Sequence, residues 1–142
     1  MDSLEKRAAV AVTPGAQAPA APRTRRELYS GSLDGIRSLL QGGKDLLTTA
    51  PRDRPEDGAA WQAWATVAEA WFDRVKHHKE NATLPAHIRQ RYDLPAGKID
   101  EAKLLKGVPP GHQQRIYSVQ VIVMALTGAE DGLDHWIITG HN

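Results

Sequence analysis

Two carboxylates and an imidazole are spaced so that one face of a helix would present them together. Glu69, Asp73 and His77 follow one another at intervals of four residues, and side chains four apart are neighbours on an α-helix. Carboxylate and imidazole groups bind divalent transition metals when a second helix completes the coordination sphere. These three residues are the candidate metal ligands. The alternative, which we favour, is a solvated face with an ion pair between Asp73 and His77.

Other reactive side chains lack partners at a spacing that would support catalysis. The chain has no cysteine, which excludes thiol nucleophiles, disulfides and cysteine-ligated zinc or iron–sulfur centres. Its serines do not lie in the glycine-rich turn of a nucleophile elbow. Gly42-Gly43-Lys44 is followed by Asp45, where a phosphate-binding loop needs Ser or Thr. We therefore predict a non-enzymatic protein that uses no cofactor.

Basic residues gather in two stretches that could contact nucleic-acid phosphates. Three arginines, Arg23, Arg25 and Arg26, lie together near the N-terminus. Four more cations lie in two short helices predicted over 85–92 and 98–105, an arrangement comparable with a helix-turn-helix: Arg89, Arg91, Lys98 and Lys103. A small nucleic-acid-binding or regulatory protein is therefore the alternative function. The formal net charge is only +1, which favours a solvated basic face over strong nucleic-acid binding.

The element that must organise the fold is a tryptophan-rich helix predicted over about residues 55–80. Its apolar residues recur at helical spacing and form one stripe. The stripe contains Trp61, Trp64, Ala68, Trp71, Phe72 and Val75. Each aromatic side chain buries about 150–250 Å² of surface, so this stripe should form the core. The candidate metal ligands lie on the opposite, polar face of the same helix.

Two further apolar segments complete the predicted body. Residues 26–47 read as a helix that Gly42-Gly43 weakens or ends, because each glycine costs about 1 kcal/mol relative to alanine. Residues 116–126 are apolar on every side, which favours a fully buried helix, although their β-branched residues leave a strand as the alternative. A helix end is predicted at Met124–Gly128. A short tail follows, for which an extended conformation is one alternative.

Both ends of the chain have compositions that indicate contact with a partner. Residues 1–26 are rich in alanine and proline and lack aromatic residues, so they should be a disordered arm unless a partner orders them. The tail contains Trp136, Ile137 and Ile138, which dock either on the protein's own core or on another chain. The candidate partner-binding residues are Arg23, Arg25, Arg26, Trp136, Ile137 and Ile138.

The sequence therefore predicts a mainly α protein, in which residues 27–142 form a single helical bundle behind the arm. The favoured function is a non-catalytic interaction or assembly protein, a structural or linking subunit of a particle such as a phage virion. Its partners would be protein subunits, identical or different, and membranes are not expected because no apolar run approaches about 20 residues. The N-terminus lacks the apolar core of a secretory signal, which predicts a cytoplasmic or virion-associated protein.

Overall fold

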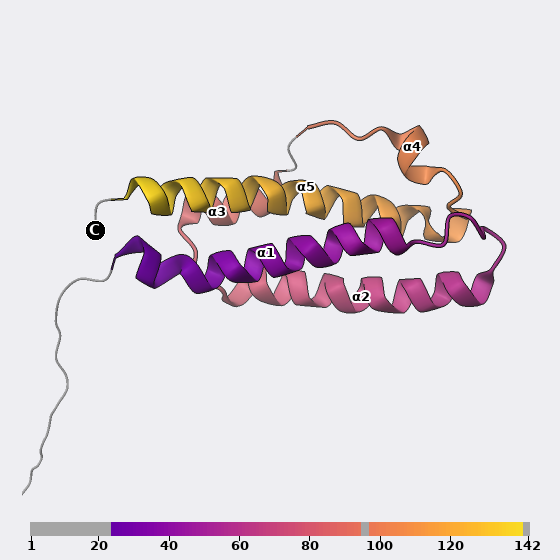
Figure 1. Cartoon of the computed structure of the whole chain (residues 1–142), viewed down its shortest axis with the longest axis horizontal. Helices are drawn as coiled ribbons and strands as arrows, with labels where there is room; N and C mark the ends of the chain where they lie inside the picture. Colours follow the sequence, from indigo (N-terminus) through magenta and orange to yellow (C-terminus); the bar gives the residue numbers. More distant parts are fainter. Residues whose placement is uncertain (1–23, 95–96, 141–142) are drawn as a thin grey trace, which may run out of the picture.

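The computed structural model describes residues 24–94 and 97–140. These residues form helices and no strand, which confirms the predicted mainly α bundle. Three long helices lie lengthwise beside one another: α1 (Arg25–Thr49), α2 (Gly58–Asn81) and α5 (Pro110–Thr139) (Figure 1). Between α2 and α5 the chain forms α3 (Ala86–Arg89), the 3-10 helix η2 (Gln90–Asp93) and α4 (Glu101–Leu105). Within the described ranges, no helix is both long and apolar enough to span a bilayer.

The aromatic stripe of α2 lies in the core, as predicted. Trp61 and Trp71 are fully buried and Trp64 is 5% exposed. Each indole N–H donates to a backbone carbonyl: Trp61 to Arg54 at 3.2 Å, Trp64 to Leu46 at 2.9 Å, and Trp71 to Leu39 at 2.8 Å. A buried indole N–H without an acceptor would destabilise the fold. The tryptophans therefore supply the apolar core and also fix the position of α2 against α1.

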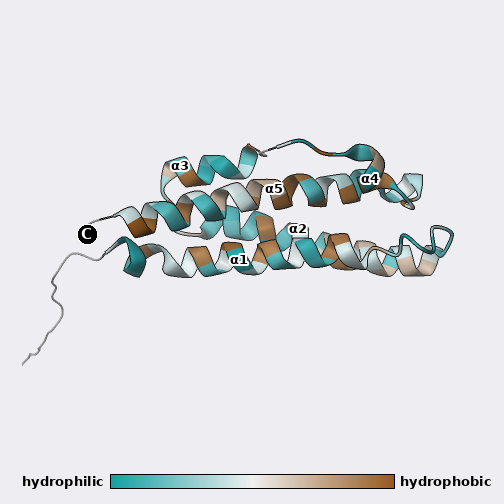
Figure 2. Cartoon of the chain, turned by 45° about the horizontal axis from the view of Figure 1, so that its top comes forward, coloured by the Kyte–Doolittle hydropathy of each residue, from teal (hydrophilic) through white to brown (hydrophobic). Residues whose placement is uncertain are grey.

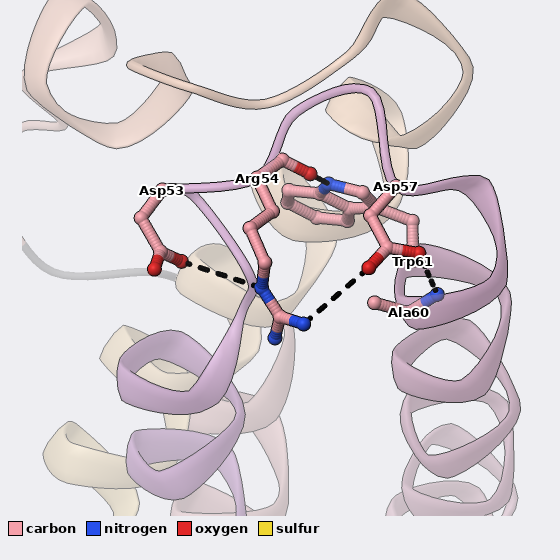
Figure 3. Close-up of polar contacts among 5 residues, drawn as sticks. All are labelled: Asp53, Arg54, Asp57, Ala60 and Trp61. Atoms are coloured by element: carbon pink, nitrogen blue, oxygen red, sulfur yellow. Dashed lines mark hydrogen bonds and ion pairs between the residues drawn. The ribbon is translucent and has the colours of Figure 1, made fainter.

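The loop between α1 and α2 is held by polar contacts that set the start of α2 at Gly58 (Figure 3). Asp57 is the N-cap, and its carboxylate accepts a hydrogen bond from the Ala60 N–H at 3.0 Å. The Arg54 guanidinium lies between two carboxylates, 3.3 Å from Asp57 and 3.9 Å from Asp53. These contacts close the turn, so the helix begins after Asp57 and not at about residue 55.

Helix α1 is continuous through Gly42-Gly43, so the predicted break is wrong. Both glycines face Trp71: a Cβ at Gly42 would lie 3.0 Å from the indole Nε1, and one at Gly43 would lie 2.6 Å from Cζ2. The missing side chains let the indole approach the backbone of α1. The packing and the indole hydrogen bond offset the low helix propensity of glycine, because tertiary contacts supply most helical stability in proteins.

Residues 116–126 are helical, because they lie within α5. Every other described element packs against α5. Hydrophobic residues recur along it with hydrophilic residues between them (Figure 2). The predicted helix end near Gly128 and the extended tail are wrong, because α5 continues to Thr139. Gly128 and Gly132 allow close contact with η2 and α3: a Cβ there would lie 3.1 Å from the Arg91 guanidinium and from Ile88 Cδ1, respectively.

The connecting helices are shorter than predicted and do not form a helix-turn-helix. Pro85 precedes α3, which is one helical turn long and continues directly into η2. Asp100 is the N-cap of α4, and its carboxylate accepts a hydrogen bond from the Lys103 N–H at 3.2 Å. The two elements lie at different positions along α5 (Figure 1). Arg89 holds the preceding turn, because its guanidinium donates to the carbonyls of Lys79 and Ala82, at the C-terminal end of α2.

Candidate functional site

The N-terminus of α1 and the C-terminus of α5 lie together at one end of the bundle (Figure 1). Trp136 joins them. Its ring packs edge-on against Tyr29 and His87, with centroids 5.1 and 5.6 Å apart, and the Arg25 guanidinium lies 3.9 Å above it. Arg25 Nη1 also donates to the Trp136 carbonyl at 2.9 Å. We call Arg25, Tyr29, His87 and Trp136 the terminal cluster.

A capping box places Arg25 in this cluster. The Thr24 hydroxyl accepts from the Glu27 N–H at 3.1 Å, and the Glu27 carboxylate accepts from the Thr24 N–H at 2.8 Å. These reciprocal bonds satisfy N–H groups that the first turn of a helix leaves without partners. As a result α1 begins at Arg25, inside the stretch that the sequence assigns to the arm. Residues 1–23 of that arm, Arg23 included, lie outside the described residues.

The predicted partner-binding residues divide into packed and exposed groups. Ile137 is buried in the core, with 6% of its surface exposed. Trp136, in the terminal cluster, is partly buried and packs against the core. Ile138 is 63% exposed, and Leu28, which the sequence did not single out, is 41% exposed on α1. Arg26 is exposed on α1. The structure thus leaves one large apolar side chain uncovered on each of the two helices, beside the terminal cluster.

The candidate metal ligands are exposed along α2, and two of the three contact other side chains. Glu69 accepts from Arg115 Nε at 2.8 Å, and Asn81 Nδ2 lies 3.2 Å from His77 Nδ1. The described ion pairs do not include the expected pair between Asp73 and His77. Over residues 24–94 and 97–140, no group of three His, Asp or Glu side chains is placed to hold a metal ion.

The cations suggested for nucleic-acid contact do not gather on one surface. The Arg89 guanidinium is half-buried against backbone carbonyls, and the Arg91 guanidinium lies over Gly128. Lys98 and Lys103 instead line a cavity beside α4. The spacing of these residues in sequence therefore does not correspond to a single basic face.

The cavity beside α4 has a volume of about 600 Å³. It lies between the end of α1, the loop that follows, α4 with its flanking residues, and α5. Cationic, acidic and apolar side chains all line it: Leu47, Arg52, Asp53, Lys98, Ile99, Asp100, Lys103, Leu104, Lys106 and Gln120. We call it the cationic cavity. Sequence reasoning missed it because its walls come from segments that are distant in the chain.

Arg52 is the half-buried cation of this cavity. Its Nη1 donates to the carbonyls of Leu104 and Lys106, the latter at 3.2 Å, and so satisfies acceptors at the C-terminal end of α4. Burial lowers the pKa of the Arg52 guanidinium, because desolvation disfavours its charged form. Arginine nevertheless stays protonated in proteins, so the cavity wall keeps a positive charge.

No family model, curated protein or solved structure matches this chain. The function is therefore inferred from the geometry of the chain itself.

Two histidines have pKa values below the ordinary value because they are packed against other elements. His78 Nδ1 lies 2.8 Å from the Tyr92 hydroxyl, and burial lowers the pKa of His78 while raising that of Tyr92. His112 stacks on Trp61 at 5.4 Å, and burial, followed by the nearby Arg115, lowers its pKa. Arg115 Nη1 lies 2.9 Å from His112 Nδ1. Because arginine only donates, this ring is neutral with Nδ1 as the acceptor.

The pKa of His78 predicts a loss of stability in mild acid. The groups facing it are the Tyr92 hydroxyl, the Ser32 carbonyl, Arg89 and His77. In the unfolded chain the pKa of His78 is the ordinary histidine value of about 6.5, and in the folded chain it is lower because the ring is buried. As the pH falls below about 6.5, the unfolded chain binds a proton that the folded chain resists, so the free energy of unfolding decreases. Above that pH both forms are neutral and the contribution does not change.

Urea denaturation at about pH 7.5 and about pH 5.5 measures this effect. His78→Gln keeps a partner for Tyr92 and should reduce the dependence of unfolding free energy on pH, leaving the part that comes from His112. His77→Gln removes the exposed neighbouring imidazole and should leave the dependence close to wild type. If the free energy of unfolding changed equally with pH in His78→Gln and in wild type, His78 would not be a source of the acid sensitivity.

Proposed function

We propose that the protein is a non-catalytic interaction protein that assembles with other subunits through the end of the bundle at which α1 begins and α5 ends. The observation that carries this proposal is the terminal cluster, which ties the two helix ends together. Tyr, Trp and Arg are the residue types that dominate the energetics of protein interfaces. Here Tyr29, Trp136 and Arg25 are each only half-buried. Part of each side chain is accessible to a partner.

The exposed apolar side chains extend the same surface. Leu28 precedes Tyr29 on α1, and Ile138 follows the buried Ile137 on α5. Single exposed hydrophobic residues are common on protein surfaces. These two differ in that both lie within two residues of a terminal-cluster residue, Leu28 beside Tyr29 and Ile138 two residues after Trp136. This end of the bundle therefore offers partly exposed aromatic residues, two exposed aliphatic side chains and the exposed Arg26 to a protein partner.

The proposal extends to a structural or linking subunit of a multi-subunit particle such as a phage virion. A subunit of this kind must hold its neighbours through segments that leave its folded body at a defined place. The terminal cluster supports such an arrangement, because it fixes the first turn of α1 against the last turns of α5. The cytoplasm or the virion would be the location of such a subunit.

Photo-crosslinking in the cells that encode the protein tests this proposal. The photoreactive residue p-benzoylphenylalanine replaces Ile138 or Leu28 in separate full-length variants. A matched control carries it in place of Val67, which is 57% exposed on α2. We expect protein adducts from positions 28 and 138 and none from position 67. Sedimentation of the adducts with a large assembly would support the proposal that the protein is a subunit of a particle. Sedimentation at the mass of a small complex would contradict that proposal.

Two outcomes would overturn the interaction surface itself. One is the absence of adducts at positions 28 and 138. The other is equal adducts at all three positions, which would indicate random collisions. Identical copies and different subunits are distinguished by the mass of the adduct, so the test does not depend on knowing the partner beforehand.

A further inference from the structure

We propose that the cationic cavity binds a small organic acid, with an apolar body and a carboxylate or phosphate head group. This property is independent of the proposed assembly surface, which lies at the end of the bundle formed by the terminal cluster. The proposal rests on the size of the cavity, its lining, and the imbalance of charge around it.

The size and the apolar lining suit a small molecule. Ligand pockets typically measure about 300–1,000 Å³ and are lined by apolar side chains with a few polar groups. The cationic cavity, at about 600 Å³, falls in this range. Leu47, Ile99 and Leu104 come from three different segments and provide its apolar wall. That wall would contact the body of the ligand.

The charges around the cavity favour an anion. Four cations line it, Arg52, Lys98, Lys103 and Lys106, against two acids, Asp53 and Asp100. Both acids already have partners. Asp53 lies 3.9 Å from Arg54, and the Asp100 carboxylate accepts from the Lys103 N–H.

Among the described residues, the four cations have no carboxylate partner, although Arg52 donates to backbone carbonyls. In the part of the chain that the structure describes, none of them forms an ion pair with a carboxylate. Positive charge lining a pocket with low-dielectric walls raises the local concentration of anions. The lining carries two more cations than acids, and a negatively charged ligand would offset this excess.

Arg52 is held in place by the surrounding backbone. Gly107 has a φ of +75°, and a Cβ at this position would collide with the Arg52 carbonyl oxygen. Glycine is therefore required for the backbone following α4 to lie against Arg52. This contact and the bonds of Arg52 Nη1 to Leu104 and Lys106 fix one wall of the cavity. Arginine carries five N–H donors, so its guanidinium can also donate to a ligand head group.

An NMR titration of the full-length chain tests the proposal with four probes: octanoate, octyl phosphate, octanol and inorganic phosphate. We expect octanoate or octyl phosphate to cause saturable shifts of backbone amides around Ile99 and Leu104. Whichever of the two binds more tightly identifies the head group. Octanol tests the need for charge and inorganic phosphate tests the need for an apolar body. Both should bind at least about tenfold more weakly, a difference of about 1.4 kcal/mol.

Paired lysine variants locate the site. Lys98→Gln with Lys103→Gln removes two exposed cations from the cavity without touching the bonds made by Arg52. Affinity for the organic acid should fall roughly tenfold, from two partly screened charge contacts. The control combines Lys44→Gln with Lys76→Gln, which removes the same charge from exposed positions that do not line the cavity. It should bind like wild type.

Several outcomes would overturn the proposal. Equal affinity for octanol and octanoate would show that charge plays no part. Equal affinity for inorganic and octyl phosphate would show that the apolar wall plays no part. Equal loss in the two paired variants would indicate a general charge effect, and the absence of saturable shifts with either organic acid would show that the cavity does not bind this class of ligand.

Discussion

Trp71→Ala is expected to lower the free energy of unfolding by about 3–5 kcal/mol, the usual cost of truncating a buried Trp or Phe. Trp71 is fully buried, and its ring contacts both α1 and the neighbouring Phe72. Its truncation opens a void and removes the hydrogen bond to the Leu39 carbonyl. Since natural domains are stable by only about 5–15 kcal/mol, this single change removes a large share of the stability.

Urea denaturation followed by far-UV circular dichroism measures this loss. The matched control is Val67→Ala on the same helix, because Val67 is 57% exposed and such surface changes stay within about 0.5 kcal/mol. Trp71→Phe keeps an aromatic ring and should give an intermediate loss, which remains measurable if Trp71→Ala fails to fold. If Trp71→Ala were as stable as Val67→Ala, the buried packing of Trp71 against α1 would be wrong.

Gly43→Ala and Gly31→Ala are expected to have opposite effects, although both place alanine inside α1. A Cβ at Gly43 would lie 2.5 Å from Val123 Cγ2 and 2.6 Å from Trp71 Cζ2. Overpacking of this kind costs about 1–3 kcal/mol. A Cβ at Gly31 would meet nothing within 4 Å, so the higher helix propensity of alanine should raise stability by about 0.5–1 kcal/mol.

A double-mutant cycle shows whether Trp71 is the source of the cost at Gly43. Trp71→Phe removes the part of the indole that a Cβ at position 43 would contact. The double variant should therefore be more stable than the sum of the two single losses predicts. Additive losses would show that the two sites are independent, and stabilisation by Gly43→Ala would show that α1 and α2 are further apart than the structure places them.

The long helices could be predicted because their apolar residues recur at helical spacing over many turns. The glycines could not be interpreted in the same way. Propensity treats Gly43 and Gly128 as points where a helix weakens, yet both mark close contacts with a side chain from another element. Spacing does not separate the two cases, because Gly31 and Gly35 recur at the same interval as Gly128 and Gly132 and yet a Cβ at Gly31 would meet nothing within 4 Å.

The candidate sites were harder to predict for a related reason. Trp136 and Arg25 are far apart in the sequence and nothing local connects them, so the sequence predicts each as a candidate partner-binding residue, with the protein's own core as the alternative for Trp136, and does not predict that they contact each other. The cationic cavity likewise needs Arg52 and Lys103 to be brought together by the fold. Sequence patterns reveal neighbours within one helix, whereas these neighbours exist only after the helices have packed.

The bond between Arg25 and the Trp136 carbonyl also determines how a mechanical load would pass through the molecule. Because the first and last described turns lie side by side, tension applied between the two chain termini is borne by this short bridge. The long helices stay unloaded while the bridge holds. When it breaks, α1 and α5 are peeled apart one turn after another and are not sheared along their lengths, and peeling is the direction in which packed helices resist force least.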